Sequence, residues 1–107
     1  MEPSNIRVGP FDFSVFWVDA NNGVDKGEFG ECDTTNLAIK IDKSVDRILQ
    51  LDTLLHEISH AIYWVYGLED KDKEERIVQI MATGWTQVFR DNPILRTFIE
   101  DSCCDSD

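Results

Sequence analysis

Basic residues are scarce in this sequence of 107 residues. Ten Lys and Arg residues stand against 21 Asp and Glu residues, which gives a formal net charge of −11 at pH 7. Proteins that grip a phosphate backbone need clusters of basic side chains, so the composition argues against direct binding of nucleic acid. An acidic surface that imitates DNA and engages a DNA-binding protein is the sharper alternative. Ordinary solvated acidity explains the same charge more simply.

Long apolar runs are also missing. No stretch reaches the roughly eighteen consecutive apolar residues that a membrane-spanning helix needs. Residues 1–5 lack the basic and apolar regions of a signal peptide. The three cysteines are an odd number and do not form a disulfide framework, so we expect reduced thiols. Together these absences predict a cytoplasmic protein that does not enter a membrane.

What remains has the composition of a globular protein. Hydrophobic residues make up 42% of the chain and aromatic residues 10%. The length suits one domain, which we place at residues 1–100, followed by an acidic polar tail at 101–107. Short runs rich in β-branched and aromatic residues predict strands at 6–8, 13–18, 27–32 and 37–41. Because the connections are short, we expect a small, mostly antiparallel sheet of three or four strands.

After residue 41 the apolar residues recur at helical spacing. We expect a helix at 45–66, capped by Ser44 and ended near Gly67, and a second helix at 73–90. Asn92 and Pro93 favour a short third helix directly afterwards. The fold class is therefore α+β, a small sheet followed by two main helices and a short one. The predicted core stripe of the first helix comprises Ile48, Leu51, Leu55, Ile58, Ile62 and Val65.

The chain has only two histidines, and both lie in one motif. Residues 56–60 read His-Glu-Ile-Ser-His inside an apolar, helix-compatible run. On a helix, His56 and His60 lie one turn apart on the same face and can direct two imidazoles at one zinc ion. Glu57 lies beside the first ligand, where its carboxylate can take a proton from water. The simpler alternative is one histidine on the helix surface and the other packed under a loop.

A catalytic zinc site normally has three protein ligands. No third histidine exists, so the remaining candidates are carboxylates and Cys32. Glu75 shares a helical stripe with Val78, Ala82 and Trp85, which we expect to face the first helix. Glu74 shares a stripe with Ile77, Met81 and Gly84 and is the alternative. Glu75 can also serve only as part of a helix cap, bonding a backbone N–H.

Three segments carry a resemblance to a known group. The histidine motif with Thr53 to Ala61, the run Glu74 to Val78, and the run Phe89 to Pro93 resemble small phage and bacterial zincin-type proteins. These are related in pattern to the ImmA/IrrE and SprT-like metallopeptidases. The resemblance covers roughly residues 6–99, and its specific part is the histidine motif. The spacing from His60 to Glu75 is short for the group, and no DNA-binding segment accompanies the domain.

The resemblance implies a zincin-like fold that holds zinc through His56, His60 and a glutamate of the next helix. It also implies that an edge strand, which we expect at 37–41, pairs with an extended peptide substrate. The leading hypothesis is therefore a zinc-dependent metallopeptidase in which Glu57 is the catalytic residue. If the chain is encoded by a phage, it would act in the host cytoplasm. The alternatives are a catalytically silent zinc-binding phage protein that blocks a host partner, and an acidic interaction domain without metal.

Overall fold

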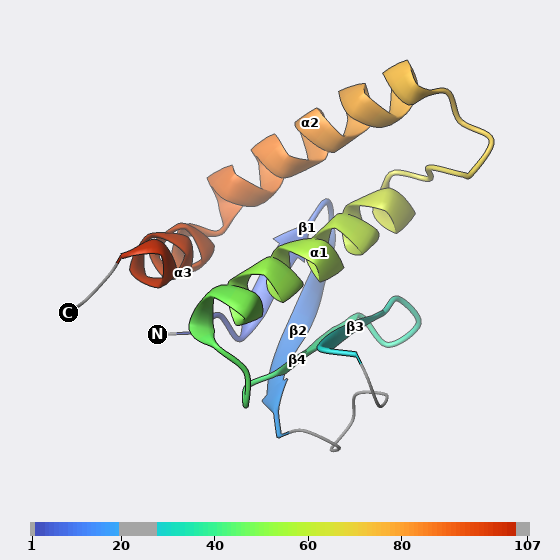
Figure 1. The fold of residues 1–107 in the computed structure, drawn as a ribbon. Helices are drawn as coiled ribbons and strands as arrows, with labels where there is room; N and C mark the ends of the chain where they lie inside the picture. The colour runs from blue at the N-terminus through green and yellow to red at the C-terminus, as the bar shows by residue number, and fades with distance from the viewer. Residues whose placement is uncertain (1, 20–27, 105–107) are drawn as a thin grey trace.

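The computed structural model describes residues 2–19 and 28–104, and it contains a four-stranded sheet followed by three helices (Figure 1). This arrangement confirms the predicted α+β class. The first residue of the predicted strand at 27–32 lies outside the described residues. The elements in chain order are β1 (Asn5–Val8), β2 (Phe11–Val18), β3 (Gly30–Asp33), β4 (Ala38–Asp42), α1 (Arg47–Val65), α2 (Glu74–Asp91) and α3 (Pro93–Cys103).

The sheet is mixed, with the strand order β1-β2-β4-β3. The two outer pairs are antiparallel, but the central pair of β2 and β4 is parallel. This parallel pair was not predicted, because β3 lies within the connection that carries the chain from β2 back to β4. As a result, the segment at 37–41 is not an edge strand. It forms β4 in the interior of the sheet, and the edges are β1 and β3.

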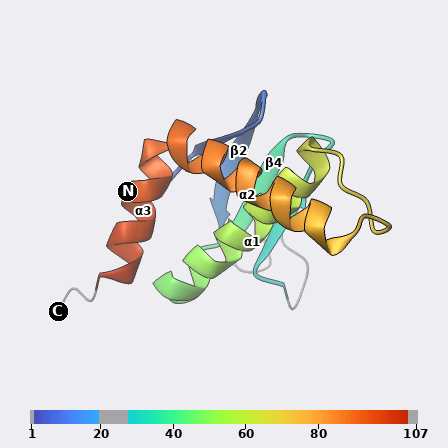
Figure 2. The ribbon, with the colours of Figure 1, turned by 90° about the horizontal axis from the view of Figure 1, so that it is seen from above.

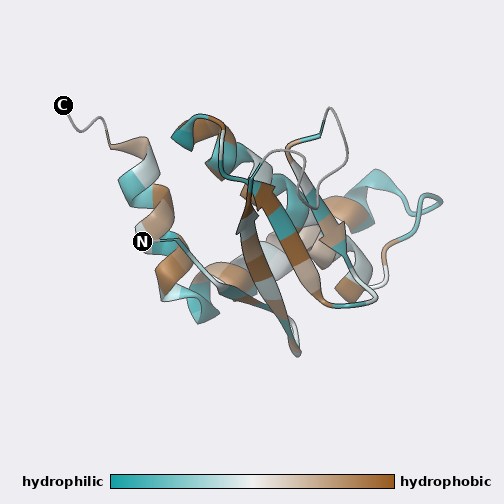
Figure 3. Cartoon of the chain, turned by 90° about the horizontal axis from the view of Figure 1, so that it is seen from below, coloured by the Kyte–Doolittle hydropathy of each residue, from teal (hydrophilic) through white to brown (hydrophobic). Residues whose placement is uncertain are grey.

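All three helices lie on one side of the sheet (Figures 1 and 2). Seen from below, the strands lie in front of the helices, and hydrophobic and hydrophilic residues alternate along them (Figure 3). This alternation directs every second side chain of β2 into the core while its neighbours face solvent. No helix within the described residues is long and apolar enough to cross a membrane. The core comprises Ile6, Val8, Phe13, Val15, Ile39, Ile41, Leu51, Leu54, Ile58, Ala61, Ile62, Val88, Leu95 and Phe98.

Helix α1 begins two residues later than predicted. The carboxylate of Asp46 accepts the backbone N–H of Ile48 and is the cap, whereas Ser44 donates to Asp42. The prediction of Ser44 as the cap is therefore wrong. The prediction that Ile48 belongs to the core is also wrong, since that residue is 52% exposed. Gly67 ends the helix as expected, with a φ of +72° that glycine adopts without strain.

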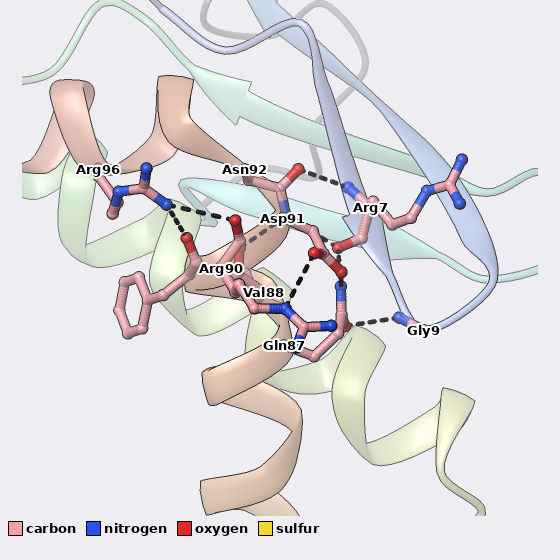
Figure 4. A network of polar contacts seen from close by, with 9 residues as sticks. Arg7, Gly9, Gln87, Val88, Arg90, Asp91, Asn92 and Arg96 are labelled. Atoms are coloured by element: carbon pink, nitrogen blue, oxygen red, sulfur yellow. Dashed lines mark hydrogen bonds and ion pairs between the residues drawn. The ribbon is translucent and has the colours of Figure 1, made fainter.

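Amide side chains cover the outer edge of β1 (Figure 4). The Asn92 side chain accepts the N–H of Arg7 at 2.8 Å and donates to the carbonyl of Arg7 at 2.9 Å. It also donates to the carbonyl of Val88 at 2.8 Å. Next to it, the Gln87 side chain accepts the N–H of Gly9 at 2.7 Å. Backbone groups that would otherwise invite another strand are thus bonded by side chains from α2 and the α2–α3 junction.

Candidate metal centre

Helix α1 places the histidine motif beside the sheet. Its buried stripe centres on Leu54, Ile58 and Ile62, all fully buried against the strands. His56 and His60 lie on the exposed flank of this stripe, one turn apart. The helix therefore uses its apolar residues for packing and leaves both imidazoles accessible.

The two imidazoles converge on one point. The Nε2 atoms of His56 and His60 are 3.1 Å apart, and the rings meet nearly edge to face at an interplanar angle of 77°. Two nitrogens bound to one tetrahedral zinc ion at about 2.05 Å lie roughly 3.3 Å apart. The observed separation is close to that value, so the pair fits two ligands of one zinc ion.

Glu57 lies between this helix and strand β3, and its side chain is only 7% exposed. Burial raises the pKa of its carboxyl group above the usual value, and the two neighbouring histidines oppose the shift. Such a carboxylate is a stronger base than an exposed one, which suits the role of a proton acceptor. The structure therefore places the predicted catalytic residue within the same site as the histidines.

Gly30 makes room for Glu57. A Cβ atom at this position would lie 2.5 Å from Cγ2 of Thr53 and 3.3 Å from Cγ of Glu57. Only a residue without a side chain lets β3 approach α1 this closely. This function of Gly30 could not be recognised from the sequence, where the glycine predicted only a bend.

These groups line one cavity of about 910 Å³ between α1 and the segment that carries β3. Trp64, which a reading of its apolar context assigns to the core, is instead 44% exposed and forms part of this cavity. Acidic side chains are frequent on the walls, and among the residues that the structure describes no Lys or Arg lines the cavity. The lining residues are Glu28, Phe29, Gly30, Glu31, Cys32, Thr34, Leu49, Asp52, Thr53, His56, Glu57, His60, Tyr63 and Trp64.

The predicted third ligand is not part of this cavity. Within residues 2–19 and 28–104, no three His, Cys, Asp or Glu side chains are grouped so that they could hold a metal ion. Glu74 and Glu75 are both exposed in the first turn of α2. The structure thus brings together His56, His60 and Glu57, and leaves both glutamates of α2 outside.

The expected phase of α2 is wrong. Its fully buried residues are Gly84 and Val88, and a Cβ atom at Gly84 would lie 2.4 Å from Cγ2 of Ile62 on α1. The stripe of Val78 and Ala82, which also carries Glu75, faces solvent, since Val78 is 57% exposed. The stripe that faces α1 is the one that carries Glu74. Several apolar residues on adjacent positions of α2 made the two stripes indistinguishable in the sequence.

Cys32 lies in the cavity wall opposite α1. Burial, followed by the negative charges of Glu57 and Asp33, raises the pKa of its thiol from 9.0 to about 11. The thiol therefore keeps its proton at neutral pH. A metal ion would have to displace that proton before Cys32 could serve as a ligand.

No model of a known protein family matches the chain, and comparisons with curated proteins and with solved structures also found no match.

Proposed function

We propose that this protein is a zinc-dependent peptidase. The observation that carries the proposal is the convergence of His56 Nε2 and His60 Nε2, 3.1 Å apart, beside the buried carboxylate of Glu57 in one cavity. Two imidazoles and an adjacent base are the residue types that metal-assisted hydrolysis needs, and here they meet at one place.

His56 and His60 would hold the zinc ion, with a third ligand from the first turn of α2. The phase of that helix favours Glu74 over Glu75, because the stripe of Glu74 includes Gly84, which packs against Ile62 of α1. Glu74 lies ten residues, about 15 Å, before that contact, so the start of α2 would have to move toward the histidines for Glu74 to reach the ion. The alternative is Glu75, which the sequence pattern favoured as the ligand. When bound, zinc supplies Lewis acidity, which polarises the scissile carbonyl and makes a nearby water more acidic.

In the proposed reaction, Glu57 transfers a proton from the attacking water to the leaving amine. Its carboxylate accepts a proton from the attacking water while the water oxygen forms a bond to the carbonyl carbon of the substrate. The same carboxyl group then delivers the proton to the amide nitrogen as the C–N bond breaks, so that a free amine leaves. The raised pKa of Glu57 suits both the acceptance and the return of the proton.

The outer edge of β3, where no strand pairs among the described residues, is the proposed support for an extended peptide substrate. The N–H of Asp42 bonds the carbonyl of Phe29, so the alternation of an antiparallel pair turns the backbone groups of Gly30 and Cys32 away from β4. Gly30 is also packed against Glu57. A peptide strand added here would run past the proton acceptor, with main-chain hydrogen bonds holding it.

A catalytically silent zinc-binding protein that blocks a partner is the second candidate. The exposure of Glu74 and Glu75, away from the cavity walls, favours it, because the groups that would complete the ligand set are not held in place. Both candidates require zinc, so metal content alone does not distinguish them.

A Glu57→Gln variant distinguishes the two candidates. Protein purified without added metal should contain about one zinc per chain, and this variant should keep it because Glu57 is not a ligand. If the protein is a peptidase, cleavage of a diverse peptide library, followed by mass spectrometry, should disappear in Glu57→Gln. An Asp52→Asn variant, which changes another carboxylate of the cavity wall, is the control and should retain cleavage. Wild-type protein without zinc overturns both candidates, and cleavage that survives in Glu57→Gln overturns the role of Glu57.

The third ligand is tested by Glu74→Gln and Glu75→Gln, made one at a time. We expect Glu74→Gln to weaken zinc binding about 10- to 100-fold in a competition titration with a chelator, and Glu75→Gln to leave it unchanged. Glu100→Gln, an exposed change on α3, is the control. The reverse order would assign the ligand to Glu75, and zinc binding unchanged in both variants would exclude α2 as the source.

A further inference from the structure

The apolar face of α2 is wider than the part that α1 covers. Gly84 and Val88 are buried, and beside them runs a second apolar row that we call the outer stripe. Successive residues of a helix are 100° apart, so all four members of this row fall within an arc of about 60°. Val78 is 57% exposed and Phe89 38% exposed. The outer stripe consists of Val78, Ala82, Trp85 and Phe89.

Figure 2 shows α2 on the outside of the molecule, with α1 beneath it. Trp85 and Phe89 stack along the stripe with ring centroids 5.2 Å apart. None of the four residues lines the cavity, so the proposed active site does not account for them. Val78, Ala82 and Phe89 are exposed, whereas Trp85 is partly buried against the core. A row of largely exposed apolar side chains along three turns of a helix is an arrangement that binding partners use.

The charges along α2 are complementary to those of a second α2 that runs in the opposite direction. Glu75 lies in the first turn and Arg90 in the last, on the same flank of the outer stripe. Ala82 lies midway between them. In an antiparallel pair centred on Ala82, each Glu75 comes opposite Arg90 of the partner subunit. The small side chain at the centre lets the two helices approach closely.

The low net charge of α2 also favours this helix as a place of contact between two copies of the chain. The whole chain has a net charge of −11, so most of its surface repels another copy. Helix α2 carries three acidic and two basic residues, a net charge of only −1. The net charge of α2 is thus a small part of the charge of the chain, so repulsion opposes contact between two α2 helices only weakly.

We propose that two copies of this chain associate through antiparallel α2 helices. The interface is two-fold symmetric, with the outer stripes packed together and two Glu75–Arg90 ion pairs across the axis. A single pair of helices buries less surface than the roughly 1,600 Å² of a standard interface, so the dimer is weak. Its expected Kd is on the order of 10 to 100 µM.

Sedimentation equilibrium of the full chain, from about 1 µM to about 1 mM, tests the interface. We expect a monomer–dimer equilibrium that Ala82→Glu abolishes, because it places two carboxylates face to face at the symmetry axis. Thr83→Glu adds the same charge one position along, outside the outer stripe, and should keep the dimer. Circular dichroism of both variants verifies that α2 remains folded. A monomer at every concentration, or equal loss of the dimer in both variants, would overturn the proposal.

A charge exchange tests the antiparallel direction. Arg90→Glu should weaken the dimer about tenfold, because each ion pair becomes a repulsive pair of carboxylates. Adding Glu75→Arg to the same chain restores opposite charges and should return the Kd to within about twofold of the wild-type value. Failure of the second change to restore association would exclude this pairing of the two helices.

Discussion

The two edges of the sheet differ in what faces their free backbone groups. At β1, the amides of Asn92 and Gln87 bond the exposed N–H and C=O groups. At β3, the corresponding groups of Gly30 and Cys32 point away from β4, on the side of the cavity. Within the part of the chain that the structure describes, the sheet is thus closed at one edge by side chains that take the place of a strand, and no strand or side chain bonds the other edge, beside Glu57.

The difference teaches how a small domain separates stability from function. An unprotected edge is a risk for aggregation, and the chain covers it at β1, away from the proposed site. Strand β3 has four residues, as β1 does, but it carries acidic side chains. Those charges limit unwanted pairing between copies and leave the edge accessible to the proposed peptide. Changes at β1 should therefore affect folding, and changes at β3 should affect the site.

Asn92→Ala should have the largest effect. Asn92 is 5% exposed and makes three hydrogen bonds, so its loss leaves the N–H of Arg7 in β1 without its partner and removes a donor from the carbonyls of Arg7 and Val88. We expect the free energy of unfolding, measured with urea, to fall by about 2–4 kcal/mol. Asn92→Asp should be at least as destabilising, because it sets an acceptor against two carbonyl oxygens. Asn36→Ala removes an exposed amide and should cost less than about 0.5 kcal/mol. Equal losses for Asn36 and Asn92 would contradict the assigned role.

Gly30→Ala should have the next largest effect on the free energy of unfolding. The added Cβ atom would meet Cγ2 of Thr53 at 2.5 Å, so β3 has to move away from α1. The expected loss of stability is about 1–3 kcal/mol. Adding Thr53→Ser removes that methyl group but keeps the hydroxyl that bonds the carbonyl of Leu49, and it should recover part of the loss. If the two changes are simply additive in urea denaturation, the close approach is not the cause.

Gln87→Ala should have a smaller effect. Gln87 bonds the N–H of Gly9 and the carbonyl of Arg7, but water can reach these groups once the side chain is removed. We expect a loss of about 1 kcal/mol in the free energy of unfolding. Gln79→Ala, on the exposed side of the same helix, is the control and should change it little. A loss as large as that of Asn92→Ala would show that the edge depends equally on both amides.

Cys32 provides the mildest test, at the open edge. Its pKa of about 11 leaves about 100-fold less thiolate at pH 8 than an ordinary pKa of 9.0 would. In a mass-spectrometric labelling experiment, Cys32 should react with iodoacetamide after the exposed Cys103 and Cys104. Urea should remove the delay. Labelling of Cys32 first in the folded protein would contradict its burial.

The raised pKa of Cys32 also predicts that the free energy of unfolding falls at alkaline pH. The folded state holds the Cys32 proton more strongly than the unfolded chain does, because its pKa is raised from 9.0 to about 11. This contribution is therefore complete below pH 9 and is lost as the pH rises from 9 to 11. Cys32→Ala should remove that part of the pH dependence. An unchanged profile in the variant would assign the alkaline loss to other groups.

The local sequence pattern was sufficient to predict the helices and strands, because each depends on residues that are neighbours in the chain. Helical spacing predicted α1 and α2 to within two residues at each end, and Gly67 marked the end of α1. The pairing of His56 and His60 was also predictable, since four residues on a helix make one turn. The geometry of the two histidines was thus accessible from the sequence.

Features that depend on distant contacts were not predictable. The parallel pair of β2 and β4 requires the chain to cross over through β3, and no local sequence pattern predicts that connection. The phase of α2 depends on which row meets Ile62 of α1, and Gly84 makes that contact because it lacks a side chain. The role of Asn92 in bonding β1 spans 85 positions of sequence. A reading of its neighbours identifies it only as a helix cap.

That long span has a consequence for biosynthesis. The backbone of Arg7 in strand β1 leaves the ribosome 85 residues before the Asn92 amide that bonds it. Until then the strand is exposed to any other nascent chain, which is the condition under which chaperones act. Strand β1 is thus synthesised before the residue that protects it. The yield of the protein in the cell should therefore depend on chaperone supply more strongly than its final stability suggests.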